Sequence, residues 1–185
     1  KYEIAVAPLE GTTILANGNN GALSVCAVTN ENGFLKAPDI YMKKIAIGFD
    51  FGEEIINVDQ SCKNNLQNIA TAKKCNVTDL IVTILNRPRH QKLISEVKSI
   101  GARVRLINDG DIAAVIETTK GISDVYMGIG GSPEGVLAAS ALKALGGQFS
   151  GQLVIDSDEE REKSRKMGIN DFLKVYSLKE LVSDD

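Results

Sequence analysis

Residues 80–85 have the sequence LIVTIL, an apolar run broken by a single threonine. Such a run is typical of a strand that is buried on both faces, as in parallel sheets. A helix is expected over residues 89–100, and Gly101 would end it. The same order of strand, loop and helix recurs twice before Leu145. Three such repeats predict an α/β fold with a parallel sheet and right-handed crossovers.

The flanking segments have weaker patterns. Strands are expected over residues 2–6, 22–29, 41–48, 54–58, 149–155 and 174–176. Helices are expected over residues 61–74, 157–168 and 178–182. Ser61 would cap the first of these helices. A boundary between two lobes is predicted at 77/78, where antiparallel-looking strands give way to the repeats of strand and helix.

The composition limits the classes of partner. A chain of 185 residues that is 43% hydrophobic can bury one core or two small lobes. Its 21 basic and 24 acidic side chains include no basic run, so nucleic acid is not expected as a partner. No apolar stretch approaches the roughly 18 residues that span a bilayer, so no membrane partner is expected. The three cysteines form no Cys-x-x-Cys pair and indicate reduced thiols of a cytoplasmic protein.

Ligands of open α/β sheets bind beyond the carboxyl ends of the strands, so the strand-to-helix junctions are the places to search. At the first junction, Arg87 and Arg89 flank Pro88 at the start of a helix. Guanidinium groups can bind phosphate with two hydrogen bonds, and a helix N-terminus adds free N–H donors. The alternative is a pair of surface arginines on a loop. His90 is expected on the helix surface.

The second junction has the sequence Asp109-Gly110-Asp111. Gly110 permits close approach of the backbone, and paired carboxylates can accept hydrogen bonds from sugar hydroxyls. The alternative is that Asp111 only caps the following helix.

The third junction is residues 128–135, with the sequence GIGGSPEG. Ser132 would cap the helix, Pro133 would occupy its first position, and Glu134 would lie in the first turn. Glu134 is therefore either a metal ligand or a partner of the helix dipole. Pro133 stands where the dinucleotide fingerprint has its third glycine, which argues against a nucleotide-binding Rossmann domain.

A fourth cluster, residues 8–13 with the sequence PLEGTT, follows the first strand. Its carboxylate at Glu10, its glycine at Gly11 and its hydroxyls at Thr12 and Thr13 could coordinate Mg²⁺. The same groups could position water and a phosphoryl group.

Taken together and in this order, the clusters resemble the class II fructose-1,6-bisphosphatases, a bacterial family that often also hydrolyses sedoheptulose-1,7-bisphosphate. The resemblance covers essentially all 185 residues and includes residues 9–13, 22–25, 37–42, 87–90, 108–111 and 128–138. It implies the layered α-β-α sandwich of the lithium-sensitive sugar phosphatases, incomplete at both ends. It also implies hydrolysis of the 1-phosphate of fructose-1,6-bisphosphate in gluconeogenesis, by water that Mg²⁺ or Mn²⁺ activates.

The resemblance implies a role for each cluster. Glu10 and Glu134 would bind metal, and Thr12 would act with Glu10 in catalysis by orienting the attacking water. The substrate would be bound by Glu10, Gly11, Thr12, Tyr41, Arg87, Pro88, Arg89, Asp109, Gly110, Asp111 and Gly131. Residues 1–77 would be the C-terminal part of a metal-binding α+β lobe, and residues 78–185 an α/β lobe that binds substrate.

Two departures from the family pattern bear on activity. The family sequence Asp-Pro-Leu/Ile-Glu-Gly-Thr has a metal-binding Asp where this chain has Ala7, through natural loss or deliberate substitution. Family members also extend beyond both ends of this chain, so we expect a fragment or inactive variant that forms a homo-oligomer when full length. A non-catalytic sugar-phosphate-binding module is the alternative, because the arginine and glycine clusters are intact while the metal site is not.

Overall fold

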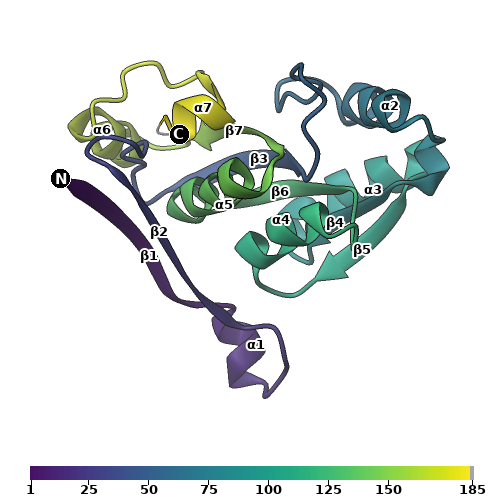
Figure 1. Cartoon of the computed structure of the whole chain (residues 1–185), viewed down its shortest axis with the longest axis horizontal. Helices are drawn as coiled ribbons and strands as arrows, with labels where there is room; N and C mark the ends of the chain where they lie inside the picture. Colours follow the sequence, from purple (N-terminus) through teal and green to yellow (C-terminus); the bar gives the residue numbers. More distant parts are fainter. Residues whose placement is uncertain (184–185) are drawn as a thin grey trace.

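The computed structural model describes residues 1–183, and its largest unit is a six-stranded mixed sheet (Figure 1). The strands lie in the order β5-β4-β6-β3-β7-β8. They are β3 (Tyr41–Ile47), β4 (Ile81–Leu85), β5 (Arg103–Ile107), β6 (Val125–Gly131), β7 (Gln148–Val154) and β8 (Val175–Ser177). β5, β4 and β6 are parallel neighbours, as the run LIVTIL predicted.

β3 departs from the parallel order. It lies antiparallel between β6 and β7, with Tyr41 opposite Gly131 on one side and Val154 on the other. β8 is antiparallel to β7. The expectation of a parallel sheet is therefore correct for three strands, and the whole sheet is mixed. β3, which lies before residue 77, is part of the sheet that the strands after residue 78 form. The lobe boundary at 77/78 stays a prediction.

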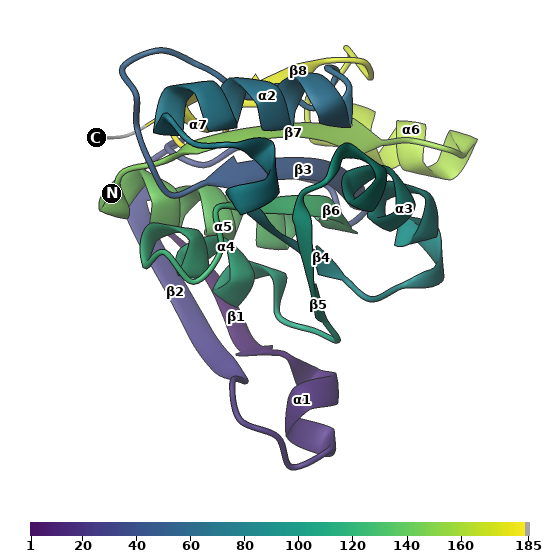
Figure 2. The ribbon, with the colours of Figure 1, turned by 90° about the vertical axis from the view of Figure 1, so that its right-hand side faces the viewer.

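Helices cover both faces of the sheet and give the molecule its layers (Figure 2). One face carries α2 (Cys62–Lys73) and α3 (Gln91–Ile100), and the other carries α4 (Asp111–Thr119) and α5 (Ser132–Leu145). Side chains of β3 alternate between the two cores: Ile45 and Ile47 join the α2 side, and Met42 and Ala46 join the α4 side. The α/β fold with helices on both sides of a sheet is confirmed.

A separate antiparallel ribbon packs on α5 (Figure 1). It consists of β1 (Tyr2–Glu10) and β2 (Leu23–Asn30). Its inner side chains, among them Ala7 and Val25, contact the core on the α5 side. Its outer face leaves Tyr2, Ile4 and Val28 exposed. The ribbon thus adds a fourth layer, and it ends at the start of α1 (Thr12–Ala16).

Three local predictions are wrong. Residues 54–58 form a loop. The N–H groups of Ile55 and Val58 donate to the Gln148 and Ser150 side chains and not to a neighbouring strand. Residues 128–131, expected in a loop, extend β6 by pairing with β3. β1, expected to end at residue 6, continues to Glu10, because an edge strand with a shifted register tolerates a proline.

The remaining helices and turns were largely expected. The Asn64 N–H donates to Ser61 Oγ at 3.1 Å, which confirms Ser61 as the cap of α2. The others are α6 (Asp158–Lys166), α7 (Leu178–Leu181) and the 3-10 turns η1 (Val77–Asp79) and η2 (Pro88–His90). Across residues 1–183, no helix is long and apolar enough to cross a membrane.

Candidate functional site

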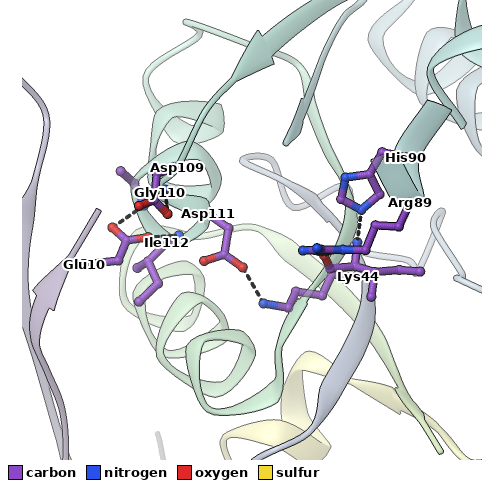
Figure 3. A network of polar contacts seen from close by, with 10 residues as sticks. Glu10, Lys44, Arg89, His90, Asp109, Gly110, Asp111 and Ile112 are labelled. Carbon is purple, nitrogen blue, oxygen red and sulfur yellow. Dashed lines mark hydrogen bonds and ion pairs between the residues drawn. The ribbon is translucent and has the colours of Figure 1, made fainter. Parts of the chain in front are cut away.

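Glu10, at the end of β1, reaches the first turn of α4 (Figure 3). Its Oε1 accepts the Ile112 N–H at 2.6 Å, and its Oε2 accepts the Ala113 N–H at 3.4 Å. These N–H groups have no partner within the helix, so the carboxylate accepts hydrogen bonds that they could not otherwise make. A negative charge at this end of a helix is also stabilised by the helix dipole. This buried side chain thereby links the ribbon to α4, in addition to the packing of the ribbon on α5.

The environment of Glu10 disfavours its charged form. Burial raises the pKa of Glu10 from 4.5 to about 7, and the hydrogen bond from Ile112 opposes this rise. The carboxylates of Asp111 and Asp109 raise the pKa further. Glu10 therefore exchanges its proton near neutral pH, which is unusual for a glutamate.

Asp109 joins the start of α1 to the start of α4. Its Oδ2 accepts the Thr13 N–H at 3.0 Å, and its Oδ1 accepts the Gly110 N–H at 3.0 Å. Gly110 precedes α4 with a φ of 88°, in the left-handed region that favours glycine. Gly110, and not Asp111, is thus the cap residue of α4, and the alternative reading of Asp111 as a cap is wrong.

Asp111 instead forms a buried ion pair with Lys44 of β3 (Figure 3). Lys44 Nζ lies 2.6 Å from Asp111 Oδ2, and the Lys44 side chain is only 1% exposed. A Cβ atom at Gly130 would lie 2.5 Å from the same Oδ2, so this glycine makes room for the pair. Lys44 was not among the residues predicted for the site. Its one signal was a lysine between Met42 and Ala46, which share its face of the strand.

His90 is buried and not on the helix surface as expected. Its Nδ1 lies 2.7 Å from the Leu85 carbonyl oxygen, and its Nε2 lies 2.8 Å from the Ile129 nitrogen. Because the carbonyl can only accept and the amide can only donate, His90 is neutral with its proton on Nδ1. Burial lowers the pKa of His90, which agrees with the neutral form. The ring therefore fixes the end of β4 against β6.

The two arginines of the first junction separate. Arg89 donates to the Ile129 carbonyl from Nε (3.0 Å) and from a terminal nitrogen (2.8 Å), and it lies 4.8 Å above the Tyr41 ring. Arg87 donates to the Asn86 carbonyl at 3.3 Å. It lines a cavity of about 510 Å³ together with Asp109. The side chains of Arg87 and Arg89 thus extend to two different sites, although the two residues directly flank Pro88.

A series of neighbouring residues begins at Arg89: it contacts Tyr41, which lies opposite Gly131, and Gly131 lies next to Glu134. Tyr41 is half exposed and pairs with Gly131. A Cβ atom at Gly131 would lie 1.9 Å from Glu134 Oε2, so the Glu134 carboxylate folds back over this glycine. Gly131 is also the cap of α5, which begins at Ser132, one residue earlier than predicted.

Comparison with known proteins identifies the family. All of residues 1–185 match the family described as bacterial fructose-1,6-bisphosphatase, glpX-encoded. The chain belongs to this family. It is 40% identical over 199 residues to the D-fructose 1,6-bisphosphatase class 2/sedoheptulose 1,7-bisphosphatase of Trichodesmium erythraeum, covering 100% of the chain and 57% of that protein. The protein of the same name from Gloeobacter violaceus is 40% identical over 197 residues, which cover 99% of the chain and 57% of the relative.

The family resemblance is thus confirmed, and the chain spans a little more than half the length of these bisphosphatases. The relative from Synechocystis has the same name and is 39% identical over 195 residues, which cover 98% of the chain and 56% of the relative. No position-by-position role follows from these names. The site residues carried over from the bisphosphatase pattern stay predictions.

The metal expected for a bisphosphatase of this family does not fit the residues present. Within residues 1–183, no three His, Cys, Asp or Glu side chains come together to hold a metal ion. Both oxygens of Glu10 face backbone N–H groups, and Asp111 is paired with Lys44. Ala7 offers only a methyl group, packed against the core.

Proposed function

We propose that the chain provides the sugar-phosphate-binding part of an enzyme that hydrolyses the 1-phosphate of fructose-1,6-bisphosphate in gluconeogenesis. One observation supports the proposal: the side chains of two arginines that flank Pro88 lie at two separate sites, and each lies beside a proposed substrate-binding residue. Arg89 lies over Tyr41, and Arg87 lines the cavity next to Asp109. Two guanidinium groups suit the two phosphates, and the neighbouring carboxylates suit the hydroxyls of the sugar.

Glu10 and Thr12 are the proposed catalytic residues. A pKa of about 7 suits Glu10 for transferring a proton at neutral pH. Thr12 lies two residues further on, exposed at the start of α1, where its hydroxyl would orient water. Dependence on Mg²⁺ or Mn²⁺, with Glu134 as a second ligand, belongs to the proposal for the full-length enzyme and needs ligands beyond those gathered in residues 1–183.

The second candidate is a non-catalytic module that binds sugar phosphates. It is favoured by the contrast between the metal ligands, which do not gather within residues 1–183, and the Tyr41–Arg89 contact, which is formed. Location in the cytoplasm is a further proposal, supported by three free cysteines. Assembly into a homo-oligomer is proposed for the full-length protein on the family resemblance.

Calorimetry tests the proposed binding site. Fructose-1,6-bisphosphate is titrated without metal into the unsubstituted chain, into Arg89→Gln and into the control Arg103→Gln. Arg103 lies at the start of β5 and donates to the Asp79 carbonyl, at the amino ends of the parallel strands. We expect binding that is about 10- to 100-fold weaker in Arg89→Gln, because hydrogen bonds to charged groups are lost, and unchanged in Arg103→Gln.

No binding by the unsubstituted chain, or equal losses in both arginine variants, would refute the proposed site. A phosphate-release assay with Mg²⁺ on the full-length protein carrying Ala7→Asp then separates the two candidates. Release favours the enzyme, and binding without release favours the module.

A further inference from the structure

Tyr126 of β6 is fully buried, and its hydroxyl has no hydrogen-bond partner within the described residues. A tyrosine hydroxyl normally finds a partner when it is buried, because the loss of water is otherwise unfavourable. Phenylalanine would fill the same space without this disadvantage. The hydroxyl therefore calls for an explanation other than packing.

The hydroxyl lies next to the candidate site. Tyr126, Gly128 and Gly130 are alternate residues of β6 and share the α4 side of the sheet. A Cβ atom at Gly128 would lie 3.7 Å from the Tyr126 hydroxyl, and one at Gly130 would lie 2.5 Å from Asp111 Oδ2. Alternate residues of a strand are about 7 Å apart. The hydroxyl and the Asp111 carboxylate therefore follow one another along the strand. The hydroxyl makes no direct hydrogen bond to that carboxylate, so a link between the two requires a bridging water molecule.

The charged side chains that affect the pKa of Tyr126 are residues of the candidate functional site. Burial raises the pKa of Tyr126 well above 10, and Asp111 raises it further. Arg89 lowers the pKa, and Glu10 raises it. The hydroxyl thus keeps its proton at every physiological pH and can act as a donor to a carboxylate.

We propose that Tyr126 is a positioning residue of the sugar-phosphate site. Its hydroxyl donates through one buried water to Asp111, which Lys44 holds from the other side. Asp111 is thereby kept in the orientation in which its second oxygen can accept a hydrogen bond from a sugar hydroxyl. This role rests on the proposed function, since Asp111 is assigned to substrate binding there.

The experiment compares Tyr126→Phe with Ser123→Ala. Ser123 Oγ is also buried without a partner among the described residues, but it precedes β6 at the amino end of the strand, away from the site. Urea unfolding and calorimetry with fructose-1,6-bisphosphate are measured on both variants and on the unsubstituted chain. Neither variant is expected to unfold at a markedly lower urea concentration, because neither removes a direct hydrogen bond to another protein group. Only Tyr126→Phe is expected to bind the sugar bisphosphate more weakly, by about tenfold.

Each other result counts against the positioning role. Unchanged affinity in Tyr126→Phe overturns it and leaves the proposed function standing. Weaker binding together with lower stability assigns Tyr126 to packing. Weaker binding in both variants assigns the loss to a general disturbance of β6. Absence of binding by the unsubstituted chain overturns the proposed function itself, and the positioning role with it.

Discussion

Replacing Glu10 with glutamine should change how the stability of the chain depends on pH. In the folded chain the pKa of Glu10 is about 7, against an ordinary value of 4.5. Between these two values the folded chain holds a proton that the unfolded chain has released. The free energy of unfolding therefore falls as the pH rises from about 4.5 to about 7, and this effect levels off above that range.

The size of the effect follows from the same two values. Each pKa unit corresponds to about 1.4 kcal/mol, so the rise from 4.5 to about 7 corresponds to roughly 3 kcal/mol. Glu10 is only 6% exposed, so solvent screens little of this energy. The amide of the Glu10→Gln variant would keep a carbonyl that accepts the Ile112 N–H but would carry no charge beside Asp109 and Asp111.

Urea unfolding of both proteins at pH 5, 6, 7 and 8 measures the difference. Taking the difference between the two proteins removes the contribution of His90, whose lowered pKa makes stability rise with pH below 6.5 in both. We expect the Glu10→Gln variant to gain about 3 kcal/mol relative to the unsubstituted chain between pH 5 and pH 8. Parallel pH curves would refute the buried, high-pKa assignment of Glu10.

Two further substitutions probe the buried polar contacts. Lys44→Met leaves Asp111 buried without its partner and should lower the free energy of unfolding by about 3–5 kcal/mol. Urea titrations at pH 7 measure this loss, and a loss below about 1 kcal/mol would contradict the buried pair. His90→Leu leaves the Ile129 N–H without its partner and removes one of two donors from the Leu85 carbonyl, which still accepts the Arg87 N–H. It should lower the free energy of unfolding by about 1–3 kcal/mol, with faster hydrogen exchange at Ile129, and unchanged exchange there would count against the contact.

The position of the three junctions was predictable because parallel strands end at the same edge of a sheet. LIVTIL identified β4 as a buried strand, and the repeats that follow it gave β5 and β6. Arg89, Asp109 and Gly131 therefore lie at one edge although the chain separates them widely. The expected glycine loop turned out to be strand, because only the neighbouring β3 reveals that residues 128–131 have partners.

Lys44 and His90 could not be placed from sequence. The partner of Lys44 is 67 residues away, and nothing in the local pattern of β3 identifies it. His90 follows two arginines in a polar junction, which favours an exposed position. Its burial depends on the packing of η2 against β6, where Gly128 leaves room for the ring. Contacts of this kind are determined by tertiary packing and not by local periodicity.

The place of β3 in the sheet has a consequence for biosynthesis. Tyr41 pairs with Gly131 and with Val154, so β3 is synthesised well before the two strands that pair with it. Pairings between distant segments form slowly, and an unpaired apolar strand is open to association with other chains meanwhile. A nascent chain that stops before β7 would keep one side of β3 open, so this strand can pair on both sides only after synthesis has passed residue 154.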